Sequence, residues 1–234
     1  GVSGGIDSAL TSTLCAKTGL PTLCLEMPIK QQQSQVDRAQ EHIRWLRKHH
    51  TNVAEKMVLL YPVFDALSKA VEADEQKNED LLSLANTRAR LRMVTLYYYA
   101  ACKRYLVAGT GNKVEDFGVG FYTKYGDGGV DLSPIADLSK TQVRALASTL
   151  GVDQKILNAP PTDGLWDDGR NDEEQLDATY EQLEWAMTQH AAGKSPADFV
   201  GENARVFEVF LSHHNANKHK MEPIPVCSIP KQLL

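Results

Sequence analysis

Apolar residues recur along the chain with two periods, one typical of helices and one typical of short buried strands. From residue 34 onward they are spaced at intervals of three and four, which predicts a helix with one buried face: Val36, Ala39, Ile43 and Leu46. Compact apolar runs on either side of it, over residues 21–27 and 57–60, predict strands. Strands that alternate with helices are typical of an α/β fold, so we expect a soluble α/β protein.

The remaining elements continue this alternation. Further helices are predicted over residues 8–17, 81–104, 140–150 and 176–191 and from Ser195 onward, and a further strand over residues 105–108. The stretch 118–131 is too rich in glycine for a helix or a central strand. The length suits one α/β domain covering residues 1–234. Because the chain begins inside a glycine turn of the kind that follows a buried strand, we expect an N-terminal strand to be missing.

The first eight residues, Gly-Val-Ser-Gly-Gly-Ile-Asp-Ser, carry the strongest chemical signal. Adjacent glycines let the backbone turn tightly against a ligand, and the N–H groups that open the following helix favour phosphate. Ser3 and Ser8 offer hydroxyl donors, and Asp7 offers a hard carboxylate for magnesium. No lysine follows the glycines, so this is not the G-x-x-x-x-G-K-[ST] phosphate loop. Taken alone, the stretch also fits an ordinary glycine turn capped by serine.

A second glycine turn, Gly-Thr-Gly-Asn-Lys over residues 109–113, follows the predicted strand 105–108. The carboxyl end of a strand in an open α/β sheet is the usual place for a ligand, so this turn is a second candidate for phosphate binding. Glu115 and Asp116 stand close behind it. A carboxylate from this pair could complete a magnesium shell with Asp7.

Composition narrows the possible partners. The formal net charge is −5, which gives no general attraction to nucleic acid or to anionic membranes. No apolar run approaches the ~18 residues of a membrane span, and the start of the chain lacks a signal-peptide pattern. The four cysteines lie far apart without a C-x-x-C pair. We therefore expect reduced thiols in a cytoplasmic protein rather than a zinc site or a disulfide framework.

Residues 3–8 match S-G-G-x-D-S, the pyrophosphate loop of enzymes that split ATP into AMP and pyrophosphate. Three further stretches resemble the ammonia-dependent NAD synthetase family. They are Asn-Thr-Arg-Ala-Arg-Leu-Arg-Met at 86–93, residues 109–115 running into Phe-Tyr-Thr-Lys-Tyr-Gly-Asp-Gly-Gly-Val-Asp at 121–131, and His219-Lys220 with Pro223 nearby. The resemblance runs from Gly1 to about Pro225.

The resemblance implies an α/β, Rossmann-like three-layer fold with a mostly parallel sheet, of the adenine nucleotide alpha hydrolase-like type, and a particular reaction. In that family the nicotinate carboxylate of deamido-NAD attacks the α-phosphate of ATP, which gives an acyl-adenylate and pyrophosphate. Ammonia then displaces AMP to form NAD. Glutamine-dependent relatives carry an extra hydrolase domain with a cysteine nucleophile, for which 234 residues leave no room. Free ammonia is therefore the expected donor, with a separate glutaminase partner as the alternative.

The resemblance also implies roles for individual residues. The ATP phosphates would be held by Gly1, Ser3, Gly4, Gly5, Ile6, Asp7 and Ser8, with further ATP contacts from Thr110, Lys140 and Thr162 and a weaker adenine contact from Gln33. Deamido-NAD would be held by Arg90, Lys124, Asp131, His219 and Lys220. Asp7 and Glu115 would bind magnesium, and Asp7 and Asp127 would be catalytic, Asp127 by orienting ammonia or taking its proton. Family members are homodimers, which makes the helix face over residues 96–101 a candidate subunit contact.

Two departures from the family pattern change this assignment locally. Between Glu115 and Lys124 the chain is one residue longer than the commonest pattern, so Asp116 competes with Glu115 as the metal ligand. Thr162 lies in Pro-Thr-Asp-Gly-Leu-Trp over residues 161–166, which differs from the usual Pro-Ser-Ala-x-Leu, so its contact with ATP is less secure.

Two other functions stay open at this stage. One is another ATP pyrophosphatase, of the tRNA-thiolation or GMP synthetase type, and the other is a nucleotide-binding module without turnover. The acidic charge and the scattered cysteines disfavour an enzyme that acts on tRNA. The acid pair Asp7 and Glu115 disfavours a sensor, because a sensor has less need of a metal at the scissile phosphate.

Overall fold

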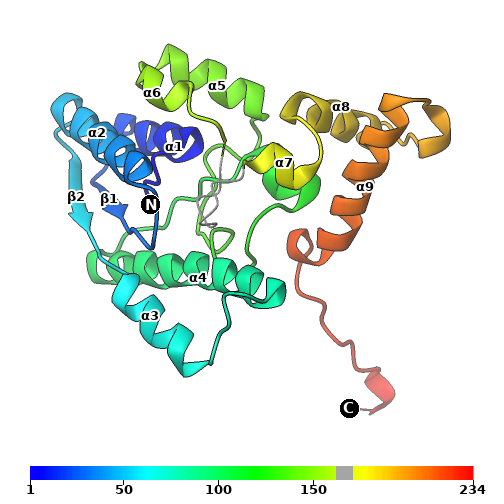
Figure 1. The fold of residues 1–234 in the computed structure, drawn as a ribbon, viewed down its shortest axis with the longest axis horizontal. Coiled ribbons are helices and arrows are strands. Elements are labelled where there is room, and N and C mark those ends of the chain that lie inside the picture. Colours follow the sequence, from blue (N-terminus) through cyan, green and yellow to red (C-terminus); the bar gives the residue numbers. More distant parts are fainter. Residues whose placement is uncertain (162–170, 234) are drawn as a thin grey trace.

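A computed structural model describes residues 1–161 and 171–233 and shows an α/β fold (Figure 1). The helices are α1 (Ile6–Lys17), α2 (Gln33–His49), α3 (Tyr61–Ala70), α4 (Asn78–Lys103), α5 (Lys140–Thr149), α6 (Gln154–Leu157), α7 (Asp172–Leu176), α8 (Tyr180–Ala191) and α9 (Glu202–Met221). The strands are β1 (Thr22–Glu26) and β2 (Val53–Met57). A π-helix, η1 (Lys113–Val119), and two 3-10 turns, η2 (Pro196–Asp198) and η3 (Lys231–Leu233), complete the described elements.

The sheet is small and parallel. Strands β1 and β2 pair in a register that places Thr22 opposite Val53, and the N–H of Val2 donates to the carbonyl of Leu25 at 2.9 Å. The first residues of the chain therefore run alongside β1. An isolated parallel bridge joins Ala108 to Leu132.

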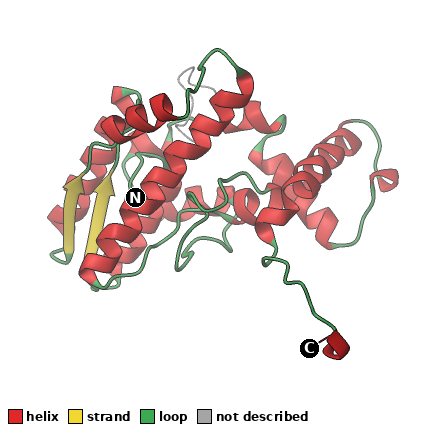
Figure 2. Cartoon of the chain, turned by 90° about the horizontal axis from the view of Figure 1, so that it is seen from below, coloured by secondary structure: helices red, strands yellow, loops and turns green. Residues whose placement is uncertain are grey.

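Helices cover both faces of this sheet (Figures 1 and 2). Cys24 of β1 and Val53 of β2 pack in a cluster with Ala39, Ile43 and Leu46 of α2. Leu25, the next residue of β1, packs in another cluster with Phe64 of α3 and Leu84 of α4. Successive side chains of a strand point to opposite faces, so β1 contributes to both clusters. The α/β class expected from the apolar pattern and the Rossmann-like, three-layer form implied by the resemblance are confirmed.

Two further clusters extend the core away from the sheet. One joins α1 to α5 and α6 through Leu10, Val143 and Ile156. The other joins η1 to α8 and α9 through Val114, Tyr180 and residues on α9. These contacts bring the start of α1, the π-helix and the start of α5 toward the middle of the molecule.

Two strand predictions are wrong in detail. Of the apolar run 57–60, only Met57 belongs to the sheet, as the last residue of β2. The chain turns away after it because Pro62, in the first turn, starts α3 at Tyr61. Residues 105–108 form no regular strand and share only the bridge at Ala108. The reason is that the N–H of Val107 donates to the Asp131 carboxylate at 2.8 Å, so a side chain takes the place of a neighbouring strand.

Three helix predictions also need correction. The predicted helix over 176–191 is broken at Asp177, which is left-handed with φ 53°, and resumes at Tyr180 after a capping box at Thr179. Ser195-Pro196 starts only the turn η2, and α9 begins after Gly201, whose φ is +60°. Within the stretch predicted to be irregular, residues up to Val119 belong to η1. The helices predicted over 8–17, from 34, over 81–104 and over 140–150 are confirmed within a few residues.

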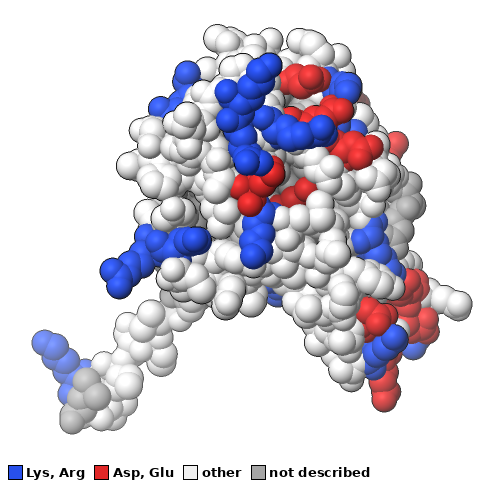
Figure 3. All heavy atoms as spheres, turned by 90° about the vertical axis from the view of Figure 1, so that its left-hand side faces the viewer, with Lys and Arg blue, Asp and Glu red and all other residues white. Residues whose placement is uncertain are grey.

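Surface features agree with the composition. The face on the α2 and β2 side carries Lys and Arg next to Asp and Glu rather than one sign of charge (Figure 3), as in the ion pairs Arg47–Glu55 and Lys155–Glu41. Residues 222–233 leave α9 as an exposed arm that reaches away from the body (Figure 1). Across the described ranges, no helix combines the length and apolar character needed to cross a membrane.

His42 is a buried imidazole that we expect to contribute to the acid sensitivity of the fold. It is buried in α2, and its Nε2 lies 3.0 Å from the Ser12 hydroxyl. Since that hydroxyl donates to the Ser8 carbonyl at 2.7 Å, Nε2 of His42 carries the N–H. Burial lowers the pKa of His42 from 6.5 to about 4. The unfolded chain therefore binds more protons than the folded protein between these two values.

We predict that the free energy of unfolding falls by about 3 kcal/mol as the pH is lowered from 6.5 to 4, and that His42→Gln removes this slope. Urea unfolding followed by circular dichroism at a series of pH values measures it. His49→Gln is the matched control, because the His49 side chain on the same helix is exposed. An acid slope of equal size in wild type and His42→Gln would contradict the assignment.

Candidate active site

The first turn of α1 and the loop before it form a compact cradle. Gly4 has a φ of +85°, and a Cβ at this position would lie 2.4 Å from the carbonyl oxygen of Gln35. Only glycine fits here, because both the left-handed backbone and the contact with α2 exclude a side chain. Arg38 Nε donates to the Gly4 carbonyl at 3.2 Å and holds the turn from the same helix.

The two serines of the loop hold it closed. The Ser8 hydroxyl donates to the Gly5 carbonyl at 2.9 Å and accepts from the Ser3 N–H at 3.1 Å. The Ser3 and Ser8 hydroxyl oxygens are also 3.1 Å apart. Gly5 is the N-cap of α1, and no side chain caps this helix. A helix start without a side-chain cap leaves N–H donors for an anion.

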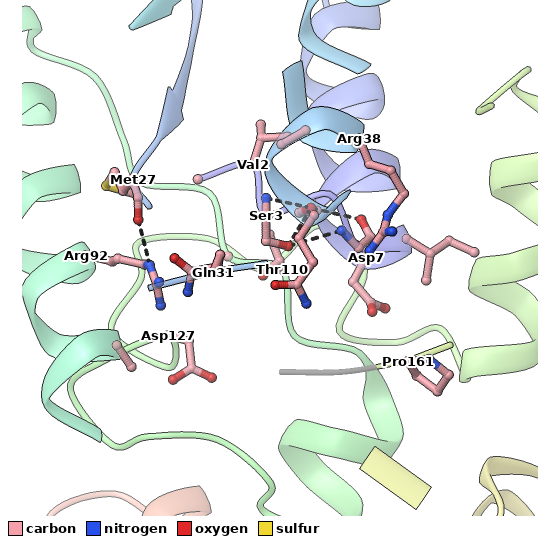
Figure 4. A pocket seen from close by; sticks show the side chains of 18 of the residues that line it. Val2, Ser3, Asp7, Met27, Gln31, Arg38, Arg92, Thr110, Asp127 and Pro161 are labelled. Carbon is pink, nitrogen blue, oxygen red and sulfur yellow. Dashed lines mark hydrogen bonds between the residues drawn. The ribbon is translucent and has the colours of Figure 1, made fainter. Parts of the chain in front are cut away.

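A cavity of about 260 Å³ opens next to this cradle. Its lining includes the loop residues Ser3, Asp7 and Ser8, residues of α4 and the second glycine turn with Thr110. Figure 4 shows Asp7 at the loop and Asp127 on a separate segment, both facing the cavity, with Arg92 bound to the Met27 carbonyl at its edge. The cavity therefore offers cationic, carboxylate and backbone groups together.

A buried ammonium group joins the two acids that were predicted to bind metal. Lys140 Nζ lies 2.5 Å from Asp7 Oδ2 and 2.9 Å from Glu115 Oε1, and its side chain is 3% exposed. Asn112 donates to the other oxygen of Asp7 at 3.2 Å. Asp7, Glu115 and Lys140 come from α1, η1 and α5, so three distant segments meet at this point.

Electrostatics favour the charged forms of Lys140 and Glu115, whereas burial raises the pKa of Asp7. Burial alone would lower the pKa of Lys140, but the neighbouring carboxylates of Asp7 and Glu115 outweigh it and raise the pKa. Burial alone would raise the pKa of Glu115, but the charge of Lys140 and the hydrogen bond from Tyr180 outweigh it and lower the pKa. The Tyr180 hydroxyl is 2.5 Å from Glu115 Oε1.

Asp116 behaves differently from its neighbour Glu115. Its carboxylate packs on Gly111, where an added Cβ would lie 1.9 Å from Oδ2. Burial, followed by the charges of Glu115, Asp127 and Asp7, raises the pKa of Asp116 to about 8. The pKa of Asp116 is thus raised whereas that of Glu115 is lowered, and the assignment of the metal to Glu115 stays a prediction.

The carboxylates of Asp7 and Glu115 suit a metal ion that also binds the phosphates of a substrate. Asp7 and Glu115 offer hard oxygen atoms close enough to contact one ammonium group, which fits magnesium. Over residues 1–161 and 171–233, no group of three or more His, Cys, Asp or Glu side chains could hold a metal ion. Magnesium usually keeps waters and substrate phosphates among its ligands, so two protein carboxylates are consistent with it.

The other predicted ATP contacts are only partly described. Thr110 and Lys140 line the cavity, as do Gly1, Ser3, Gly5, Ile6, Asp7 and Ser8. Gln33 is not in the lining; its amide donates to Asp37 at 2.8 Å. Thr162 lies outside the described residues. Asp127 lines the cavity and accepts the Thr123 N–H at 3.0 Å.

The residues predicted to hold deamido-NAD form a second neighbourhood, outside the lining of the cavity. Lys124 Nζ donates to the His219 carbonyl at 2.5 Å, and Arg90 donates to the Lys124 carbonyl at 3.4 Å. Lys220 Nζ binds backbone carbonyls of the glycine-rich segment at 2.9 and 2.8 Å. Asp131 lies apart from these four and accepts from Tyr97 and Val107.

Several residues of the site were not predicted. Asn112 lies in the glycine turn that the sequence highlights, and its role as N-cap of η1 was a signal that could have been used. Arg38 and Arg92 bind loop carbonyls from helices. Tyr180 carries no local signal, because Glu115, to which its hydroxyl donates, is 65 positions away; Asp172 Oδ2 lies 3.2 Å from the same hydroxyl.

Comparison with known proteins places this geometry in a family. A family model described as NAD synthase matches residues 1–224. The NH3-dependent NAD+ synthetase of Carboxydothermus hydrogenoformans is 37% identical over 206 residues, which cover 86% of this chain and 80% of that protein. The corresponding protein of Syntrophomonas wolfei is 36% identical over 236 residues, covering 100% of this chain and 88% of the relative.

Two solved structures share the whole fold. The NMN synthetase from Francisella tularensis superimposes with a TM-score of 0.81 at 33% identity and covers 98% of this chain and 87% of its own. The NH3-dependent NAD synthetase from Campylobacter jejuni superimposes with a TM-score of 0.75 at 25% identity, and the match covers 97% of this chain and 87% of that chain.

Fold and site together define a Rossmann-like adenine nucleotide alpha hydrolase, with a glycine loop at a helix N-terminus beside a cavity. Within that class, the chain belongs to the NAD synthase family, whose members use ATP as a substrate. The family suggested by the sequence motifs is thereby confirmed.

We predict that Lys140→Met lowers the free energy of unfolding by about 3–5 kcal/mol, because it leaves two buried carboxylates without a counter-ion. Urea unfolding at pH 7 without magnesium measures the change. Lys113→Met is the matched control and should cost less than about 1 kcal/mol, since Lys113 pairs with an Asp137 side chain that is 97% exposed. Equal losses in the two variants would contradict the central role of Lys140.

Proposed function

We propose that this protein catalyses the ATP- and magnesium-dependent amidation of deamido-NAD by ammonia, which yields NAD, AMP and pyrophosphate. This is the last step of NAD synthesis. The observation that carries the proposal is the meeting of Asp7, Glu115 and Lys140 beside the glycine loop, in a chain of the NAD synthase family. The NH3-dependent NAD+ synthetases among its relatives support ammonia as the nitrogen donor.

The chemistry requires two anions to meet. The nicotinate carboxylate must approach the α-phosphate of ATP, so the site has to neutralise the phosphates and hold the attacking oxygen in line. We assign the N–H groups of the first turn of α1 and the hydroxyls of Ser3 and Ser8 to the phosphates. Lys140 is assigned to the phosphates as well. Its ammonium group would exchange a carboxylate partner for a phosphate oxygen.

Asp7 and Glu115 would hold the magnesium ion. When bound, the metal supplies positive charge that stabilises the phosphates during transfer. Lys140 contacts both carboxylates in this structure, so its ammonium has to release at least one of them when ATP and metal enter. This release is compatible with the assignment of Lys140 to the phosphates, because the carboxylate it leaves and the phosphate it binds are both anions.

Asp127 is assigned to the second half of the reaction. Its exposed carboxylate faces the same cavity as Asp7 and accepts the Thr123 N–H at 3.0 Å. A carboxylate here can accept an N–H of ammonia and take a proton as the amide forms. The neighbourhood of Arg90, Lys124, His219 and Lys220 is assigned to deamido-NAD, with Asp131 beside it.

A second acceptor also has support. The structure of an NMN synthetase superimposes with a higher TM-score than the Campylobacter jejuni NAD synthetase, at 0.81 against 0.75, and with higher identity, at 33% against 25%. The corresponding reaction would place the same amide on nicotinic acid mononucleotide. Both acceptors present one nicotinate carboxylate, so the same phosphate and ammonia groups would serve either.

We predict that the purified protein with ATP, magnesium, ammonium and deamido-NAD forms AMP and NAD in equal amounts. Asp7→Asn should lower the rate at least about 100-fold, because it removes both a metal ligand and the partner of Lys140. Chromatography of both products measures the reaction, and Asp198→Asn, an exposed residue that binds Ser195, is the matched control.

The same assay separates the competing functions. Faster turnover of nicotinic acid mononucleotide than of deamido-NAD would favour the second acceptor. AMP formed without either amide would indicate another ATP pyrophosphatase. Failure to form AMP by a folded protein that binds ATP would contradict the proposal and indicate a nucleotide-binding module.

We also propose that the protein acts as a homodimer in the cytoplasm. All four cysteines are free, which suits a reducing compartment. On α4, Val94 and Tyr98 lie one turn apart and are 59% and 64% exposed, which is typical of an apolar subunit contact. Of the face predicted over 96–101, Leu96 and Tyr99 pack against the protein's own core, so the contact would centre on Tyr98.

We predict that Tyr98→Glu raises the dimer dissociation constant at least about tenfold, because a charge would be buried without a partner. Sedimentation velocity over a range of concentrations measures it. Val200→Glu is the control, since Val200 is an apolar residue that is 87% exposed far along the chain. A monomeric wild type, or equal constants for wild type and Tyr98→Glu, would contradict the proposed contact.

A further inference from the structure

Tyr180 connects the metal-binding acid Glu115 to the helical part of the molecule beyond the cavity. Its hydroxyl donates to Glu115 Oε1 at 2.5 Å and lies 3.2 Å from Asp172 Oδ2. Its ring lies 4.7 Å from Lys140 Nζ. One side chain thus contacts both Glu115 and the ammonium that Glu115 shares with Asp7.

The tyrosine is held rigidly. Its side chain is 1% exposed and packs in the cluster that joins η1 to α8 and α9. It is the first residue of α8, directly after the capping box formed by Thr179 and Gln182. Its N–H also donates to Glu173 at 3.0 Å. A hydroxyl on such a support cannot follow Glu115 if the carboxylate moves.

Glu115 itself sits on an unusual backbone. It lies in the first turn of the π-helix η1, which Asn112 caps by accepting the N–H groups of Val114 and Glu115. π-helical turns are uncommon and place side chains differently from α-helical ones. The direction of the carboxylate therefore depends on contacts from outside the element.

We infer that Tyr180 is a positioning residue that fixes the Glu115 carboxylate for metal binding. Lys140 also holds Glu115 Oε1, at 2.9 Å, but that contact is lost if the ammonium turns to the phosphates of ATP. The tyrosine hydroxyl carries no charge and is not assigned to the phosphates, so it holds Glu115 through the exchange. This inference rests on the proposed function, because it takes Glu115 as a magnesium ligand.

The hydroxyl can be removed without removing the ring. Tyr180→Phe keeps the aromatic face beside Lys140 and the packing against α9, and it deletes the hydroxyl with its contacts to Glu115 and Asp172. Tyr122→Phe is the matched control, since the Tyr122 hydroxyl donates to the Lys220 carbonyl and not to a metal-binding acid. Glu115→Gln shows how much Mn²⁺ affinity is lost when the proposed metal ligand itself is replaced.

The experiment measures Mn²⁺ affinity in the presence of α,β-methylene-ATP by electron paramagnetic resonance, with the metal bound by free analogue subtracted. Tyr180→Phe should weaken Mn²⁺ binding about 10- to 100-fold, as loss of an outer partner of a metal ligand does. Tyr122→Phe should bind like wild type. In the Glu115→Gln background, Tyr180→Phe should have no further effect, because the hydroxyl acts through Glu115.

Each other result would overturn the inference in a distinguishable way. If Tyr180→Phe lowers the free energy of unfolding but binds Mn²⁺ like wild type, the hydroxyl has only a structural role and the proposed function still stands. If the wild type itself binds no Mn²⁺ beyond that held by the analogue, both the inference and the assignment of Glu115 fail. Unfolding in urea, measured on the same samples, shows whether each variant is folded.

Discussion

The ammonium group of Lys140, buried between two carboxylates, is the contact on which the site depends. It joins Asp7 of α1 to Glu115 of η1 from the first residue of α5, at 2.5 and 2.9 Å. Buried charges are costly unless they are paired, so none of the three side chains could occupy its place without the others. The positions of α1, η1 and α5 relative to one another are therefore tied to a single cluster of charges.

Helix starts supply most of the groups around this cluster. Asp7 lies in the first turn of α1, Lys140 opens α5 after a capping box at Ser139, and Tyr180 opens α8. The N-terminus of a helix carries partial positive charge and unpaired N–H groups. The starts of three helices thus contribute side chains to one cluster, and among them α1 is the one without a side-chain cap at its N-terminus.

The sequence predicted this site where the signal is local. Residues 1–8 combine the glycine turn, the serines and Asp7 within one loop, and the structure places them together at the start of α1. The spacing of apolar residues also predicted α2, because one face of that helix is buried along its length. Where one short segment contains all the contacts, pattern and chemistry are sufficient.

Prediction failed where a distant residue decides the outcome. Residues 105–108 read as a strand, but the Asp131 carboxylate takes the Val107 N–H. A local signal was missed as well: Ser195-Pro196 reads as a helix start, but Gly201, in the same short segment, has a φ of +60° and α9 begins at Glu202. Tyr180 could not be found at all, because nothing near it in the sequence points to Glu115, 65 positions away.

The most direct test of this account is a crystal structure of the protein with Mn²⁺ and α,β-methylene-ATP, in which anomalous scattering locates the metal. We predict that the metal is bound by Asp7 and Glu115 and that Lys140 Nζ has exchanged a carboxylate for a phosphate oxygen. Phosphates bound away from the residue 1–8 loop, with Lys140 still between its two acids and no metal on them, would contradict the account.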